Sequence, residues 1–327
     1  MSTTDDGAEG NVPEPSAATL PPDPIILPGP GDDATQRAAE SVASNPTLDV
    51  AAQEVHASRL RWWREVLYIA SFYVLYTWTR NQFGSASVDS MQAYTNARRI
   101  IRVEEFLGLY HEATIQGWFI ANTLFIQFWN VFYGTFHFVV TIGVLVWLFA
   151  RRRRYYAIWR NTLAFTTALA LVGFSLFPLM PPRLLCDDCE FGAGQDNPEF
   201  VADDYPFVDT LAEYGGLWSF NEGAMARVSN QYAAMPSLHF AWSAWCALAI
   251  WSLARHRLAR FLAALYPAAT MFAIVVTANH FWLDAVGGAL VLAVGWYLGR
   301  HLALWNERRI RSELVTTNAA HPDDHRT

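Results

Sequence analysis

The sequence of 327 residues contains no lysine, so all 23 of its basic residues are arginine. It is also poor in charge: charged residues make up 16% of the chain and hydrophobic residues 53%, whereas soluble domains carry about 25% charged residues. No basic stripe suited to nucleic-acid phosphates is present, and the formal net charge is -7. The composition therefore excludes a nucleic-acid-binding protein and favours an integral membrane protein.

Cysteine is scarce, and three cysteines are too few for a disulfide scaffold. Cys246 lies in an apolar stretch, where we expect it to pack in the core. Cys186 and Cys189 form a C-D-D-C pair for which we predict a local disulfide. Zinc would need two further ligands that the spacing does not indicate. We expect neither a metal nor a cofactor.

The N-terminal segment lacks long apolar runs and is rich in proline. Residues 1–58 hold ten acids against one base, Arg37, a composition typical of a disordered acidic tail. The segment has no positively charged start followed by an apolar run, so it does not read as a secretory signal. We predict a cytoplasmic tail over 1–58, a membrane domain over 59–311 and a second short cytoplasmic tail over 312–327.

Long apolar stretches fill the middle of the chain. A membrane-crossing helix needs about 20 mostly apolar residues, and six stretches qualify: 64–83, 131–150, 161–180, 236–254, 259–279 and 281–304. These predict an all-α, polytopic protein with a bundle of six transmembrane helices. Residues 88–117 alternate apolar and charged residues at helical spacing, which predicts an amphipathic helix at the outer interface. Residues 184–233, with ten acids, form a long outer loop.

The arginines give the bundle an orientation, because cytoplasmic loops carry an excess of basic residues. With the N-terminus inside, six arginines lie on the outer side, namely Arg80, Arg98, Arg99, Arg102, Arg183 and Arg227. Fifteen lie on the inner side: Arg59, Arg61, Arg64, Arg151, Arg152, Arg153, Arg154, Arg160, Arg255, Arg257, Arg260, Arg300, Arg308, Arg309 and Arg311. We therefore predict a multi-pass cell-membrane protein with both termini in the cytoplasm.

Three short segments with chemically active side chains fall on the predicted outer side. They are Pro181-Pro182-Arg183, Met235-Pro236-Ser237-Leu238-His239 and His280-Phe281-Trp282-Leu283-Asp284. Apart from Arg183, their residues were not used to assign the orientation, so their convergence on one face indicates a site. Two histidines and a carboxylate at the ends of membrane spans indicate function by default. We predict an extracytoplasmic active site.

Each segment suits one part of a phosphoryl transfer. His280 and Asp284 share a helix face, so the carboxylate can orient one ring nitrogen and leave the other to attack. The helix start at Ser237 offers backbone amides to an anion, and His239 in its first turn can give a proton to a leaving oxygen. Arg183 supplies a planar fork for phosphate oxygens. Taken singly, a helix cap, a structural His–Asp pair and an interface anchor explain the same residues.

Further polar residues lie near these segments. His137 and Tyr133 lie one turn apart near the outer end of the second span. His137 could either line a substrate pocket or make a structural hydrogen bond to another helix. Arg227 could replace a phosphate cation. Glu104 and Glu105, beside the outer arginines of the amphipathic segment, are predicted to form ion pairs within their helix or loop.

The three segments resemble the blocks of the type-2 phosphatidic acid phosphatase superfamily, K-x6-R-P, P-S-G-H and S-R-x5-H-x3-D. The resemblance extends loosely over residues 90–305. It implies a six-helix core, His280 as a nucleophile that forms a phosphohistidine, and His239 as the general acid. It also implies Asp284 as the residue that orients His280 and Arg183 as a phosphate ligand.

The chain departs from these blocks at positions that normally bind phosphate. The first-block lysine is Leu176 and its final proline is Leu184, the second-block glycine is Leu238, and the third-block Ser-Arg pair is Ala273 and Ile274. Two of the three cations that bind phosphate in these blocks are missing. This pattern is similar to that of the inositol phosphorylceramide synthase and sphingomyelin synthase branch.

A phosphodiester carries less charge than a monoester, so the thinned blocks favour lipid phosphotransfer (inositolphosphotransferase-like) over lipid phosphatase activity on phosphatidate or an isoprenyl diphosphate. A non-catalytic lipid-binding protein is a third hypothesis. The predicted partners are membrane lipids, either anionic phospholipids or lipid phosphates. No protein partner can be inferred.

Overall fold

A computed structural model describes residues 61–83, 90–186, 189, 191–194, 205–215 and 231–320. These residues lie in one compact unit that spans Asp49–Thr327. Within them the secondary structure is helical, and the only strand-like feature is an isolated bridge between Leu179 and Ala233. The all-α prediction is confirmed for this part of the chain. The predicted tail over 1–58 lies outside the described residues.

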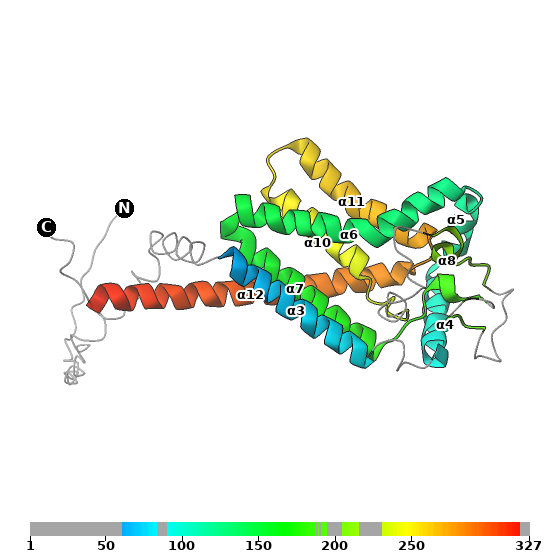
Figure 1. The fold of residues 1–327 in the computed structure, drawn as a ribbon, viewed down its shortest axis with the longest axis horizontal. Coiled ribbons are helices and arrows are strands. Elements are labelled where there is room, and N and C mark those ends of the chain that lie inside the picture. Colours follow the sequence, from blue (N-terminus) through cyan, green and yellow to red (C-terminus); the bar gives the residue numbers. More distant parts are fainter. Residues whose placement is uncertain are drawn as a thin grey trace, which may run out of the picture. The chain divides into compact units, whose positions relative to one another are not determined.

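Figure 1 shows the arrangement of the described helices. They are α3 (Trp62–Phe83), α4 (Ser90–Leu107), α5 (Glu112–Phe119), α6 (Thr123–Arg151), α7 (Arg153–Leu176), the 3-10 turn η1 (Pro182–Leu184), α8 (Thr210–Tyr214), α10 (Leu238–Leu253), α11 (Arg257–Val276) and α12 (Trp282–Ala320). The last helix continues past residue 311, so part of the predicted C-terminal tail is helical.

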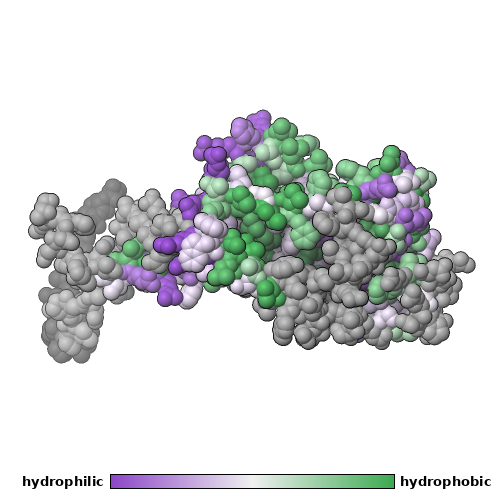
Figure 2. Space-filling model, in the orientation of Figure 1, coloured by the Kyte–Doolittle hydropathy of each residue, from purple (hydrophilic) through white to green (hydrophobic). Residues whose placement is uncertain are grey.

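Three of these helices, α6, α11 and α12, are long and apolar enough to cross a membrane. Helix α10 is apolar but shorter. Helices α3 and α7 occupy the first and third predicted spans without meeting the same criteria of length and composition. Hydrophobic residues gather over the middle of the helices, with hydrophilic ones towards the ends (Figure 2). The chain is thus a membrane protein, and the count of six spans remains a prediction.

Helix α12 packs along α7 through two glycines. A Cβ added at Gly299 would lie 2.6 Å from the backbone nitrogen of Thr162, and one at Gly295 would overlap Thr166. Glycine at both positions therefore allows the two backbones to approach closely, as small residues do at helix interfaces in membranes.

The predicted amphipathic segment over 88–117 consists of two helices rather than one. Helix α4 ends at Leu107 and α5 begins at Glu112, because Gly108 adopts a left-handed backbone with φ of 68°. Glycine takes this conformation without the steric cost that other residues incur. The turn brings both helices against the start of α12, as described below.

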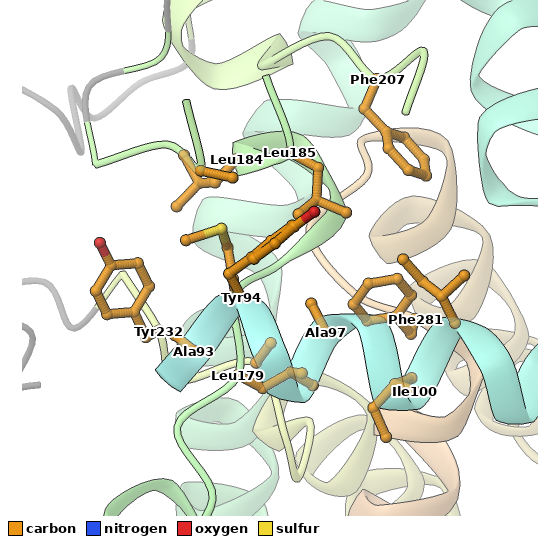
Figure 3. Close-up of a cluster of buried hydrophobic side chains, with 14 of the residues drawn as sticks. Ala93, Tyr94, Ala97, Ile100, Leu179, Leu184, Leu185, Phe207, Tyr232 and Phe281 are labelled. Carbon is orange, nitrogen blue, oxygen red and sulfur yellow. The ribbon is translucent and has the colours of Figure 1, made fainter. Parts of the chain in front are cut away.

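One face of α4 packs into a buried apolar cluster. Ala97 and Ile100 lie beside Phe281, which precedes α12 (Figure 3). The arginines at 98, 99 and 102 are on the exposed face. The packing of α4 against Phe281 fixes this helix next to the segment that carries His280.

Residues 205–215, a part of the predicted outer loop, are held by side-chain amides. Gln116 of α5 donates to the carbonyl of Val208 at 2.9 Å and accepts from its amide at 3.0 Å. Asn130 of α6 donates to the carbonyls of Thr210 and Gly215 at 2.7 and 2.8 Å. These bonds place Asp209 in front of Arg183.

Candidate active site

His280 lies in a tight connection between α11 and α12. Ala278 adopts a left-handed backbone with φ of 52°, which is uncommon for a residue other than glycine. The amides of Asn279 and His280 both donate to the carbonyl of Ile274, at 2.9 and 3.1 Å. The backbone of His280 is therefore fixed by the end of the preceding helix.

Both ring nitrogens of His280 face a functional partner. Its Nδ1 lies 3.1 Å from Oδ2 of Asp284, and its Nε2 lies 3.4 Å from Nδ1 of His239. A carboxylate can only accept a hydrogen bond, so Nδ1 of His280 carries the hydrogen and Nε2 presents a lone pair. The structure thus brings the three predicted catalytic residues together in the order Asp284–His280–His239.

The segment before His239 is seated between α7 and α12. A Cβ at Gly173 of α7 would lie 2.6 Å from Cδ of Pro236, and one at Gly287 of α12 would lie 3.2 Å from its Cβ. A Cβ at Gly288 would overlap the carbonyl oxygen of Ser237. Small residues on two helices therefore set the position of α10, and with it the distance between the histidines.

Ser237 is fully buried and caps α10. Its hydroxyl accepts from the amide of Phe240 at 3.4 Å, and its own amide donates to the carbonyl of Asp284 at 2.8 Å. That amide is used within the protein, so the predicted anion site at the helix start is reduced to the amides of Leu238 and His239.

Tyr133 and His137 of α6 both contact His239. The Tyr133 ring stacks on His239 with centroids 4.1 Å apart, and the His137 ring meets it edge-on at 4.2 Å. Nδ1 of His137 bonds the carbonyl of Tyr133 at 2.8 Å, within its own helix. The structural bond that we considered to a neighbouring helix is therefore intrahelical, and it points the ring at His239.

Arg183 is buried and paired. Its guanidinium donates to Oδ2 of Asp209 at 2.7 Å and to Oε1 of Gln231 at 2.5 Å. Its backbone amide donates to the carbonyl of Ala278 at 2.8 Å, which ties it to the His280 connection. The positive charge predicted to face phosphate is therefore already balanced by a buried carboxylate.

The positions of the family's lysine and of its Ser-Arg pair hold apolar residues in different environments. Leu176, at the end of α7, is 77% exposed, whereas Ala273 and Ile274 in α11 are fully buried. Arg227 lies outside the described residues. Cys186 and Cys189 form the predicted local disulfide. No three His, Cys, Asp or Glu side chains in the described ranges are grouped so that they could hold a metal ion.

Two buried glutamates, Glu104 and Glu112, were missed as site residues by the sequence reasoning. Oε1 of Glu104 accepts from the amide of Leu283 at 2.8 Å, and Oε1 of Glu112 accepts from that of Trp282 at 3.3 Å. The predicted ion pair is wrong for Glu104. A signal was present, because Glu104 continues the buried helical stripe of Ala97 and Ile100.

Comparison with known protein families gives a match over much of the chain. The family described as the PAP2 superfamily matches residues 98–298, a range that includes Arg183, His239 and His280. No curated protein and no solved structure matches the chain.

Proposed function

The chain belongs to the PAP2 superfamily, a family of phosphatases and phosphotransferases, and from this premise we propose that it is a lipid phosphotransferase that works through a phosphohistidine. Nε2 of His280 attacks the phosphorus of a lipid-linked phosphate ester, and the bond to the leaving oxygen breaks. His239 gives its proton to that oxygen. An acceptor hydroxyl then attacks the phosphohistidine, passes its proton to His239 and releases His280.

The observation that carries this proposal is that the two ring nitrogens of His280 face two different residues, Asp284 and His239. Asp284 at 3.1 Å holds the tautomer that leaves Nε2 basic, and His239 at 3.4 Å lies on the side of that nitrogen. A histidine nucleophile needs an orienting group on one ring nitrogen and a proton donor close to the other, and His280 has both.

The shortage of cations favours transfer from a phosphodiester. A monoester brings up to two negative charges and a diester one. Arg183 is balanced by Asp209, with both side chains buried, and two family cations are replaced by Leu176 and Ile274. An inositol phosphorylceramide synthase-like reaction, in which a head-group phosphate passes to a lipid or polyol hydroxyl, fits this charge balance. Hydrolysis of phosphatidate or of an isoprenyl diphosphate is the competing reaction.

The location of the reaction follows from the arginine distribution. We place both termini in the cytoplasm and the two histidines at the outer leaflet, since the inner ends of the predicted spans carry fifteen arginines against six outside. The substrates are then lipids whose head groups face the extracytoplasmic side.

Phosphorus NMR on the purified protein in detergent separates these reactions. The samples contain phosphatidate, an isoprenyl diphosphate, or an inositol phospholipid with a lipid alcohol acceptor. A new phosphodiester resonance without free phosphate, absent with His280→Ala, supports transfer. Release of inorganic phosphate that depends on His280 would mean that the enzyme is a phosphatase and not a transferase. Conversion that is the same for both proteins would overturn the enzymatic proposal.

A further inference from the structure

Three carboxyl groups cap three consecutive amides directly after His280. The amides are those of residues 281–283, at the start of α12. Asp284 belongs to the same helix, whereas Glu112 and Glu104 come from α5 and α4. The distances are 3.0 Å from Phe281 N to Asp284 Oδ2, 3.3 Å from Trp282 N to Glu112 Oε1, and 2.8 Å from Leu283 N to Glu104 Oε1.

All three carboxyl groups are 0% exposed to solvent. If all three groups are ionised, and so can only accept, the second oxygen of each has no donor among the described residues: Glu104 Oε2, Glu112 Oε2 and Asp284 Oδ1. Three buried, ionised carboxylates would repel one another and leave acceptors without donors, which is costly in a low-dielectric interior. One proton shared between Glu104 and Glu112 removes one of the three charges and joins their two second oxygens, because a protonated carboxyl is a donor.

Of the two glutamates, we expect Glu104 to hold this proton. Burial, followed by the hydrogen bond and charge of Glu112, raises the pKa of Glu104 from 4.5 to about 9. Asp284 from α12 also faces Glu104 and raises its pKa. Tyr110, in the turn between α4 and α5, faces the same pair, and burial followed by the charge of Glu112 raises its own pKa.

We propose that Glu104 and Glu112 are positioning residues that act as a proton-sharing carboxyl pair and hold the His280–Asp284 segment in register. The shared proton has a second effect. It removes one negative charge from the neighbourhood of a site that must accept a phosphate anion, while all three amides stay capped. The proposal rests on the proposed function only in taking His280 as the reacting group.

Substitutions on neighbouring positions of α4 test the pair. Glu104→Gln keeps an acceptor for Leu283 and supplies an N–H donor towards Glu112, so it imitates the protonated acid. Glu104→Ala leaves the Leu283 amide without its acceptor. Glu105→Ala removes the adjacent carboxylate, which is exposed, and is the matched control. We expect Glu104→Ala to lower kcat by about 10²-fold with little change in KM, because a small displacement of His280 misaligns attack.

We expect Glu104→Gln to restore most of that activity and Glu105→Ala to behave as the unsubstituted protein. The activity of the unsubstituted protein should also fall above pH 9, whereas that of Glu104→Gln should not. The proposal of a proton-sharing pair would be overturned if Glu104→Gln were as inactive as Glu104→Ala. It would also be overturned if Glu104→Ala kept full activity.

Infrared difference spectroscopy gives a readout that needs no turnover, and it serves even where Glu104→Ala fails to fold. The unsubstituted protein at neutral pH should show a protonated-carboxyl C=O band that Glu104→Gln lacks and Glu105→Ala keeps. If no such band exists, the pair is rejected even in an active enzyme. If the band is present and His280→Ala leaves lipid conversion unchanged, the proposed function fails and the carboxyl pair stands.

Discussion

Nε2 of His280 lies 3.4 Å from Nδ1 of His239, across the junction of α12 and α10. The two rings are therefore in direct contact, and the lone pair on Nε2 of His280 faces Nδ1 of His239. A phosphoryl group bound there would meet His280 as the nucleophile and His239 as the proton donor. This division of roles makes the effect of a substitution depend on the leaving group.

Replacement of His239 by Asn should harm difficult substrates most. An alkoxide leaving group needs a proton, and general acid catalysis contributes roughly 10²–10⁴-fold, so we expect a loss of that order with a lipid alkyl ester. An ester with an acidic phenol as leaving group should lose far less. His301→Asn is the control, since His301 is exposed and bonded to the carbonyl of Tyr297. Equal losses with both esters would contradict the role of His239 as the acid.

Replacement of Arg183 by Ala should destabilise the protein strongly. Its bond to Asp209 joins two buried side chains, and removal of one partner from a buried ion pair costs about 3–5 kcal/mol. The double variant Arg183→Ala/Asp209→Ala should recover part of that loss in unfolding free energy, measured by denaturation in detergent. Arg309→Ala, which removes an exposed pair with Glu313, should cost little. If the double variant loses as much unfolding free energy as the two single variants together, the Arg183–Asp209 pair does not contribute to stability.

Gly288→Ala should reduce activity through geometry alone. The added Cβ would overlap the carbonyl of Ser237 and lie 3.4 Å from the amide of Ala241, which pushes α10 away from α12 and His239 away from His280. A displacement of about 1 Å can cost 10²-fold in rate. Gly143→Ala is the matched control, because nothing lies within 4 Å of its added Cβ. Similar kcat values for both variants would disprove the packing argument.

The stability of the protein should depend on pH through Glu104. The folded state keeps a proton up to about pH 9 that the unfolded chain releases near 4.5. This stabilisation is therefore complete below pH 4.5 and is lost as pH rises to about 9. Thermal unfolding of the unsubstituted protein and Glu104→Gln should give a Tm difference that shifts in favour of Glu104→Gln across this window. A difference independent of pH would contradict the raised pKa.

Local patterns were readable from the sequence because they depend on residues that are close along the chain. The spacing of His280 and Asp284 predicted their contact, which is present although His280 lies just before α12 and not on a shared helix face, and a serine before an apolar run predicts a cap such as Ser237. The all-α membrane fold followed from apolar runs in the same way.

Contacts between distant segments were not readable. Asp209 is 26 positions from Arg183, in an acidic loop where no periodicity selects one carboxylate from ten. Glu104 meets Leu283 across 179 positions, and beside three arginines it resembled an ordinary surface acid. The break at Gly108 was overlooked for a related reason, since a single glycine can either be accommodated within a helix or end it.

Trapping of the covalent intermediate tests the central claim most directly. The protein is mixed briefly with a lipid phosphate ester, quenched in alkali, which preserves phosphohistidine, digested and analysed by mass spectrometry. The account predicts that His280 carries the transferred phosphate, with its head group when the donor is a phosphodiester, that His280→Ala carries none, and that this variant loses lipid conversion. A phosphoryl group on another residue, or undiminished turnover by His280→Ala, would contradict it.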